Sequence, residues 1–249
     1  AIEILRVKGI SKASKKMSRE ANEGIIAVSG NSDSTSLIEI NCETDFVAKN
    51  LDFINFAKEI SAINHKTLSN KENLLNEKMH NGKIVKEALV DLISKIGEKI
   101  TLGRAKTINY KNAKNYIYQH SVVEDNLSKL AVVISIITEN KSSDIDLLGK
   151  QLSMHIAASN PLSIETNEMD NKLIENEKKL IFEELKNTGK PDNIIEKISK
   201  GKLQKFIEDN SLLSQNWVMD PKKKVKDVIL EKTGSKIVIK DFIRLKIGE

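Results

Sequence analysis

Hydrophobic and polar residues follow two rounds of the same order along the chain: a strand hairpin, then helices, then a closing strand. In the first round, apolar runs at 24–28 and 36–41 flank a turn rich in Ser, Asn and Asp, which predicts a β-hairpin. Helical spacing follows at 51–64 and 73–95, and a strand is expected at 99–108. The first round therefore predicts an antiparallel sheet covered by helices.

The second round repeats this order with its own hairpin. Strands are expected at 115–123 and 130–138, around a turn of Glu, Asp and Asn. A helix follows at 144–158, and the chain closes with a helix at 225–232 and a strand at 236–247. We predict an α+β fold with two helix-covered antiparallel-sheet subdomains.

Residues 164–210 interrupt the second round with a different pattern. Leu and Ile recur near heptad spacing on both sides of Thr188–Pro191, where a Gly and a Pro predict a helix end and a new helix start. This pattern predicts an antiparallel helical hairpin, too thin to bury its apolar face alone. We expect a protruding coiled-coil arm that touches a partner or a second copy of the chain.

The predicted domain organisation has four parts. Residues 1–20 read as the end of a helical module and a basic linker helix, and the natural protein is expected to begin further upstream. The N-terminal core subdomain spans 21–110. The C-terminal core subdomain is discontinuous, with segments 111–163 and 211–249 on either side of the arm.

Composition narrows the class of protein. The chain has 249 residues with a net charge of +5, and its single cysteine, Cys42, excludes an intramolecular disulfide. No apolar run approaches the roughly 18 residues of a membrane-spanning helix. Lysines alternate with acids along most of the chain, so the basic balance is a weak sign of nucleic-acid binding. We expect a protein without a membrane segment and without direct contact to nucleic acid.

Sequence motifs for enzyme chemistry are missing. The chain has no Walker-type phosphate loop and no Rossmann glycine pattern. The four histidines, His65, His80, His120 and His155, lie far apart and show no metal-ligand spacing. Cys42 sits inside a predicted strand, where a small core residue is expected more often than a nucleophile. We predict a non-enzyme with no catalytic residue, no cofactor and no metal site.

The segment Glu43–Phe46 stands where a predicted strand passes into a helix. Asp45 fits an N-cap, because a carboxylate accepts hydrogen bonds from free backbone N–H groups. Phe46 lies one heptad before Phe53, so from the pattern alone it is expected in the core.

A series of motifs in fixed order resembles the elongation factor Ts family. The family signature Thr-Asp-Phe-Val occurs here as Thr44, Asp45, Phe46 and Val47. The resemblance continues along essentially the whole chain, through Lys95–Glu98, Tyr118–His120, Met154–Ser159, Gly189–Pro191, Gly201–Phe206, Val218–Pro221 and Phe242–Arg244. It departs at both ends: of the family's N-terminal three-helix module only the last helix is expected here, and the C-terminal module of many members is not expected after Glu249. The turn at 121–126 also looks longer than usual.

The resemblance implies a guanine-nucleotide exchange factor in translation elongation. Family members bind elongation factor Tu, with GDP or free of nucleotide, and speed GDP release. By this resemblance, Asp45 and Phe46 enter the GTPase beside its Mg²⁺ and phosphate site, and Phe46 is a wedge directed at the partner instead of the core. Ile96, Gly97 and His120 match positions that form a secondary contact.

Several alternatives stay open at this point. The arm could contact the far domain of the GTPase or form a homodimer. His120 could equally be a hydrogen-bonded strand residue. The alternative function is a basic RNA- or ribosome-associated binding protein. The bacterial cytoplasm is the expected compartment, with the mitochondrial matrix or a plastid as alternatives.

Overall fold

The structure is a computed structural model that describes residues 14, 16–139, 143–188, 191–234 and 237–249. The chain divides into two compact units. Unit one contains the described residues up to Ile137 together with Lys240–Glu249, and unit two contains those of Thr138–Ile239.

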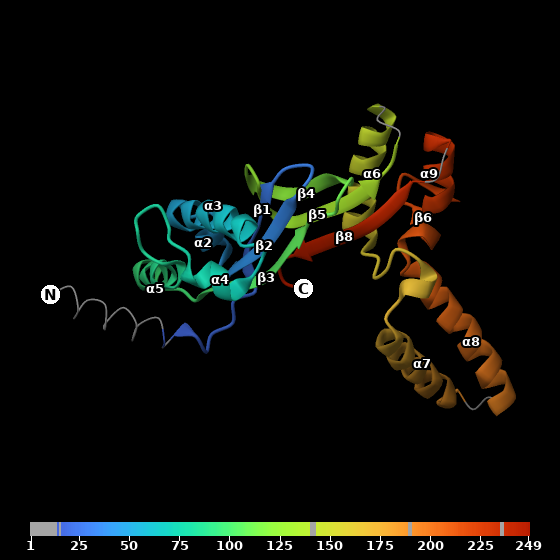
Figure 1. Ribbon diagram of the computed structural model, residues 1–249. Helices are drawn as coiled ribbons and strands as arrows, with labels where there is room; N and C mark the ends of the chain where they lie inside the picture. Colours follow the sequence, from blue (N-terminus) through green and yellow to red (C-terminus); the bar gives the residue numbers. More distant parts are fainter. Residues whose placement is uncertain (1–13, 15, 140–142, 189–190, 235–236) are drawn as a thin grey trace. The chain divides into compact units, whose positions relative to one another are not determined.

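A six-stranded antiparallel sheet forms the centre of unit one (Figure 1). Five strands are ordered β3-β2-β1-β5-β4, and the sixth, β8, pairs with β5. The strands are β1 (Glu23–Gly30), β2 (Thr35–Cys42), β3 (Ile100–Ile108), β4 (Lys114–Glu124), β5 (Leu127–Ile137) and β8 (Val238–Lys246). Both predicted hairpins are present, as β1–β2 and β4–β5, and the α+β class is confirmed.

The two hairpins belong to one sheet, whereas the repeated pattern predicted a sheet for each. Strand β1 joins them, because Ile26 and Ala27 pair with Ser128 and Leu127 of β5. The Val28 N–H also donates to the Asn126 oxygen at 2.9 Å. The run from Ile25 to Val28 is buried throughout, as expected of a strand with neighbours on both edges and cover on both faces.

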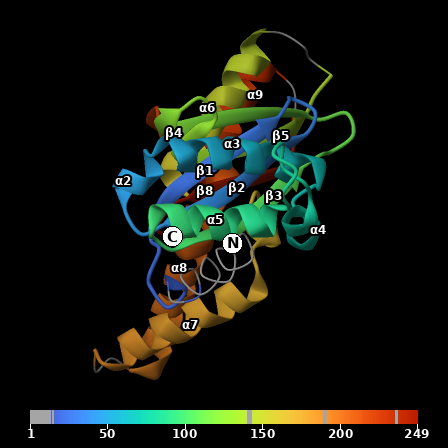
Figure 2. The same cartoon turned by 90° about the vertical axis from the view of Figure 1, so that its left-hand side faces the viewer.

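Helices cover one face of this sheet. In Figure 2, α3 (Leu51–Lys66) and α5 (Val85–Ile96) lie in front of the strands. Asn50 caps α3 by accepting from the N–H groups of Asp52 and Phe53. Phe53 is fully buried in the main core between these helices and the sheet, together with Ile25, Ile38, Ile40, Ile60, Val85, Leu92, Ile93 and Ile100. This core fixes the helices on the sheet and hence the corner between β2 and α3.

The prediction of one continuous helix over 73–95 is wrong. The structure has α4 (Lys71–Asn76), a loop, and then α5. Gly82 in the loop has φ +79°, and the loop is closed by a hydrogen bond from the Met79 N–H to the Lys83 oxygen at 2.8 Å. Asn81–Gly82 is a strong turn dipeptide, and it explains the break.

On the opposite face of the sheet, side chains of the last strand, which also pairs with β5, pack against the other strands. Ile243 and Leu245 of β8 pack with apolar residues of β1, β2, β3 and β5, namely Ile26, Val28, Leu37, Ile108, Ala131 and Val133. Buried side chains therefore lie on both faces of β1 and β2, packed against helices on one face and against β8 on the other.

Unit two is mainly helical. Its elements are α6 (Ser143–Ser159), a 3₁₀ turn (Thr166–Glu168), α7 (Asn171–Lys186), α8 (Asp192–Asp209), a 3₁₀ turn (Leu212–Ser214), β6 (Asn216–Trp217), β7 (Asp220–Lys224) and α9 (Val225–Thr233). Strands β6 and β7 form a small sheet of their own.

A buried histidine connects α6 to the segment after α8. His155 is fully buried and stacks on Trp217, with ring centroids 5.2 Å apart. Its Nε2 lies 2.9 Å from Gln215 Oε1, and its Nδ1 accepts from the Val218 N–H at 3.2 Å. Nδ1 accepts, so Nε2 carries the proton, and burial holds the pKa of His155 below its usual value.

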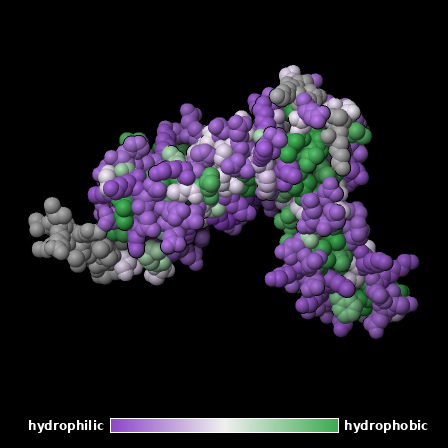
Figure 3. Space-filling view, viewed as in Figure 1, coloured by the Kyte–Doolittle hydropathy of each residue, from purple (hydrophilic) through white to green (hydrophobic). Residues whose placement is uncertain are grey.

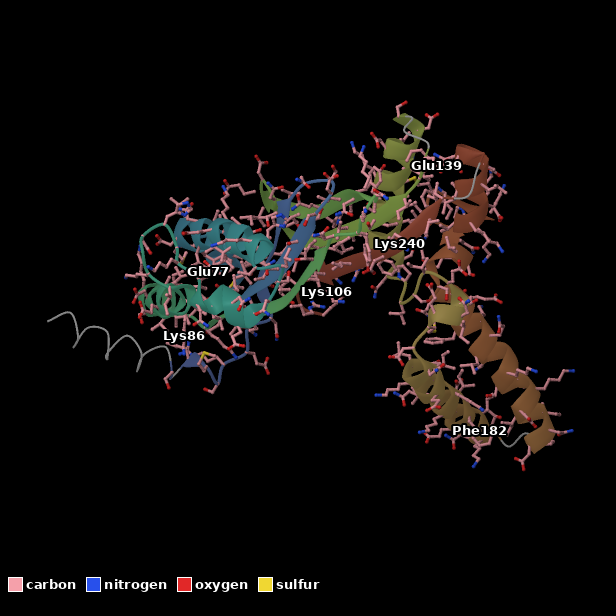
Figure 4. The ribbon with its side chains drawn as sticks, in the orientation of Figure 1. Glu77, Lys86, Lys106, Glu139, Phe182 and Lys240 are labelled. Atoms are coloured by element: carbon pink, nitrogen blue, oxygen red, sulfur yellow. The ribbon has the colours of Figure 1, made fainter. Side chains whose placement is uncertain are left out.

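The predicted helical hairpin at 164–210 is present as α7 and α8, which we call the arm. Its small core joins Ile181 and Leu185 of α7 to Ile195 of α8. Figure 3 shows hydrophobic residues at the arm surface between hydrophilic ones. Phe182, labelled in Figure 4, is 38% exposed, and the Lys186 ammonium lies 4.9 Å from its ring centroid. The arm thus buries one narrow stripe and leaves other apolar side chains at its surface.

Two predictions of helix ends involve residues outside the described part. Residues 1–13 and 15 of the predicted N-terminal helices lie there, as do Gly189 and Lys190 of the predicted helix stop. Within the described residues, the helix predicted to reach Glu23 ends at Lys16, and β1 begins at Glu23. The predicted subdomain boundaries stay a prediction.

Candidate partner-binding corner

The corner between β2 and α3 is formed by a four-residue helix, α2 (Asp45–Ala48). Thr44 is its N-cap: the residue is extended, and its Oγ1 accepts from the Val47 N–H at 3.3 Å. Asp45 was predicted as the cap, but it is the first helical residue. Thr and Asp are both good N-cap residues. Because Cys42 still pairs with Ile100 of β3, β2 ends at Cys42, and Thr44 rather than Asp45 takes the N-cap position of α2.

Neighbouring side chains of α2 differ sharply in exposure. Phe46 is 81% exposed, whereas Val47 is 8% exposed and Ala48 is fully buried in the main core. The expectation from heptad spacing that Phe46 lies in the core is therefore wrong. Phe53, one heptad later, is fully buried as predicted. An aromatic ring held in water at a capped corner is available for contact with another molecule.

Asp45 forms an ion pair within the corner. Its Oδ2 lies 3.0 Å from Lys49 Nζ, four residues later. The hydrogen bond from Lys49 is the main reason that the pKa of the Asp45 carboxyl lies below its usual value. Both side chains are about half exposed, and such surface pairs contribute little to stability. Asp45 is thus a charged group held beside Phe46.

Two carboxylates connect this corner to the end of α5. Glu98 accepts from the Thr44 N–H at 3.1 Å and from the Thr44 hydroxyl at 2.8 Å. In the reverse direction, Glu43 accepts from the Lys99 N–H at 2.6 Å and pairs with Arg19 at 3.1 Å. Burial tends to raise the pKa of Glu43, but these two hydrogen bonds outweigh it and lower the pKa. We call this arrangement the crossed-carboxylate clamp.

The clamp brings two predicted contact segments together. Ile96 is the last residue of α5 and packs against the main core. Gly97 follows as the C-cap with φ +85°, a left-handed conformation that suits glycine. Glu98 comes next in the chain and holds Thr44, so Ile96 and Gly97 lie at the corner that carries Phe46.

His120 lies elsewhere on the sheet, on the exposed part of β4. It pairs with Leu130 of β5, and its Nδ1 is 3.0 Å from the Tyr118 hydroxyl. In the part of the chain that the structure describes, no hydrogen bond or ion pair joins His120 to the corner. Lys129, the residue before Leu130, forms an ion pair with Glu23 at 2.6 Å, and Glu23 pairs with Cys42 in the β1–β2 hairpin.

Cys42 lies directly behind the corner. It is fully buried, and its thiol donates to the Thr44 oxygen with 3.1 Å between Sγ and O. Burial is the main reason that its pKa rises to about 12. A thiol that stays protonated and inaccessible is no nucleophile, which agrees with its prediction as a core residue.

Sequence reasoning missed the two carboxylates of the clamp. Glu43 and Glu98 stand beside predicted site residues, but 54 positions separate Thr44 from Glu98. The one signal in the sequence was the position of Glu98 directly after Gly97, a residue that is expected to end a helix.

The described residues form neither a metal site nor a membrane-spanning helix. They contain no group of three or more His, Cys, Asp or Glu side chains placed to hold a metal ion. None of the helices formed by these residues combines the length and apolar character that crossing a membrane requires.

Comparison with known proteins assigns the family. The family model described as "Elongation factor TS" matches residues 43–249. An elongation factor Ts of Rickettsia bellii is 40% identical over 255 residues, and one of Rickettsia rickettsii is 38% identical over the same length. Each alignment covers 100% of this chain and 82% of the relative. The chain therefore belongs to the elongation factor Ts family.

Proposed function

We propose that this chain is a guanine-nucleotide exchange factor that binds elongation factor Tu carrying GDP and promotes GDP release. The family membership supports elongation factor Tu as the partner. The exposed Phe46 at a capped corner supports exchange by insertion of an aromatic side chain. The chain also binds the nucleotide-free GTPase, and it does so as a binding protein without chemical catalysis of its own.

The exchange mechanism rests on a wedge formed by α2. Phe46 enters an apolar slot of the GTPase near its Mg²⁺ and phosphate site, with Thr44, Asp45 and Val47 forming the rest of the contact. An aromatic side chain that is 81% exposed before binding gains from burial in a partner. Asp45 supplies a negative charge beside the ring, and Val47 anchors the helix in the core.

Release of GDP follows from a coupling free energy. The chain and the nucleotide each bind the GTPase, but the geometry that accepts Phe46 disturbs the groups that hold Mg²⁺ and phosphate. Each ligand therefore weakens the other by the same factor. Ile96, Gly97 and His120 form a secondary contact in this proposal.

The arm adds a separate contact in this proposal, with a distant part of the GTPase or with a second copy of the chain. Its exposed apolar residues, Leu180, Phe182 and Ile194, support an interaction role. We place the protein in the bacterial cytoplasm, in line with its rickettsial relatives, and the mitochondrial matrix and plastid are the alternatives.

Release of a fluorescent GDP analogue from bacterial elongation factor Tu tests the function. The expected result is faster release as the chain is added at micromolar concentrations, rising to a plateau. The Phe46→Ala variant should have a much lower plateau. A release rate that does not change with added chain would contradict the proposal, and binding to RNA that weakens steeply with added salt would favour the RNA-binding alternative.

A further inference from the structure

We propose that Glu98 is a positioning residue for Phe46: through Thr44 it holds α2 in the conformation that the GTPase accepts. The inference rests on the proposed exchange function and adds a residue outside the wedge itself. Glu98 reaches Thr44 with both carboxylate oxygens, at 3.1 Å from the backbone nitrogen and 2.8 Å from the hydroxyl.

The Thr44 hydroxyl links Glu98 to the first turn of α2. A hydroxyl has one proton and two lone pairs. The proton is directed at Glu98, so a lone pair is left to accept from the Val47 N–H at 3.3 Å. Glu98 therefore sets the orientation of the group that caps α2.

Helix α2 depends on such support because it is very short. Four residues cannot form a stable helix alone, since nucleation is unfavourable and few internal hydrogen bonds form. Burial of Val47 and Ala48 anchors one side, and the cap fixes the first turn. At 81% exposure the Phe46 ring has little contact with its own chain, so its placement depends on the backbone of α2 together with its own rotamer.

The clamp ties this backbone to a rigid element. Gly97 ends α5 in a left-handed conformation, and Glu98 follows it directly. Glu43, after the end of β2, accepts from the Lys99 N–H at 2.6 Å. The end of β2 and the start of β3 are therefore joined by a carboxylate from each side. Loss of Glu98 should therefore loosen α2 while the main core stays intact.

Loss of this pre-organisation has a defined kinetic signature. If only a fraction of molecules holds Phe46 in the competent orientation, the half-saturating concentration rises in inverse proportion to that fraction, and a competent fraction of about one tenth gives about a tenfold rise. The plateau rate at saturation stays near that of the parent chain, because bound molecules carry an intact wedge. Phe46→Ala should differ by lowering the plateau, in addition to weakening binding, because the wedge itself is lost.

The test is a titration of GDP release with the parent chain, Glu98→Gln and Phe46→Ala. Glutamine keeps the shape of the side chain, but its amide nitrogen cannot accept from Thr44. We expect a rise of about fivefold to tenfold in the half-saturating concentration, with a plateau within twofold of the parent. Glu72→Gln, which changes an exposed carboxylate in the first turn of α4, is the matched control and should leave both values unchanged.

A double mutant separates positioning from a general structural role. If Glu98 acts through Thr44, the effect of Glu98→Gln on the half-saturating concentration should be smaller in a Thr44→Val background than in the parent chain, because valine removes the hydroxyl contact and keeps only the backbone N–H. Hydrogen exchange supplies a readout without the partner: the Val47 amide should exchange faster in Glu98→Gln, while core amides such as Ile60 keep their protection.

The outcomes distinguish the two levels of the proposal. A parent chain that never accelerates GDP release would overturn the proposed function and with it the role of Glu98. A normal parent curve with an unshifted Glu98→Gln curve, or with a lowered plateau alone, would overturn the role of Glu98 only. Additive effects in the double mutant would also contradict it, as would unchanged exchange of the Val47 amide.

Discussion

Phe46 and Val47 are adjacent in α2, yet the Phe46 side chain is 81% exposed and the Val47 side chain is 8% exposed. The buried neighbour holds the helix on the main core, and the exposed ring faces solvent. Substitutions at the two positions should therefore affect different properties of the protein.

Phe46→Ala is expected to change the melting temperature little, because the ring has few intramolecular contacts to lose. Binding to the GTPase should weaken by about 2 kcal/mol or more, as for an aromatic hot spot. Thermal melting and GDP release on the same preparation check both parts. Early melting together with normal release in the cold would contradict the wedge.

Two controls belong to this experiment. Leu51→Ala removes another exposed apolar side chain close in sequence, 70% exposed, and should preserve both stability and most of the exchange. Phe53→Ala removes a fully buried ring and should cost about 3–5 kcal/mol of folding stability. A Phe53→Ala protein as stable as Phe46→Ala would show that the assignment of the core is wrong.

Gly97→Ala and Gly201→Ala should change stability in opposite directions. An added Cβ meets no atom within 4 Å at either position. Gly97 has φ +85°, so alanine there should cost about 1 kcal/mol. Gly201 lies inside α8, where alanine should stabilise by about 0.5–1 kcal/mol. Chemical denaturation of both variants measures the difference, and equal effects would argue against the left-handed end of α5.

Lowering the pH should destabilise unit two through His155. Burial lowers its folded pKa below the ordinary value of 6.5. As the pH falls below about 6.5, the unfolded chain takes up a proton that the folded chain does not bind, so stability declines until the folded pKa is reached. Above about pH 6.5 the contribution is fully present. Protonation would also replace the acceptor of the Val218 N–H by a donor.

Trp217 reports on this change, because it stacks on His155 and is the one tryptophan of the chain. Denaturation followed by its fluorescence at pH 7.5 and pH 5.5 should show lower stability at the lower pH. In His155→Gln the dependence over this interval should be weaker than in the parent chain. The same dependence in both proteins would assign it to other groups.

Cys42 should resist thiol reagents in the folded protein. With a pKa of about 12 and no exposure, the reactive thiolate is scarce and inaccessible at pH 8. Reaction with a chromogenic disulfide should follow the opening of the corner and become rapid in denaturant. Rapid stoichiometric labelling of the native chain would show that the region around Thr44 is open.

Replacement of residues 180–198 by a short Gly/Ser turn should leave the remaining fold intact. The core of the arm is formed by its own residues, Ile181, Leu185 and Ile195. Its ends meet at the base, where the Ser163 and Ser211 hydroxyls lie 3.0 Å apart. Exchange should weaken without vanishing. Circular dichroism that shows global unfolding would mean that the arm is essential to the fold.

Local patterns were sufficient for most of the elements. The hairpins, the helix that carries Phe53 and the helical hairpin of the arm were predicted because period-2 and period-3.6 spacing is a property of consecutive residues. The break between α4 and α5 could also have been predicted, since Asn81–Gly82 is a local turn signal. The Thr44–Val47 motif likewise placed the corner correctly in the sequence.

Long-range contacts decided the features of the fold and of the corner that local patterns did not predict. The two hairpins share one sheet because β1 pairs with β5 across about a hundred residues, a pairing that strand patterns do not encode. The sequence by itself determined which segments are helices and strands, the family and the position of the corner. Only the tertiary structure decided that Thr44 caps α2, that Phe46 faces solvent and that Glu98 holds Thr44. Each of these depends on how distant chain segments pack, and a linear pattern contains no distances between them.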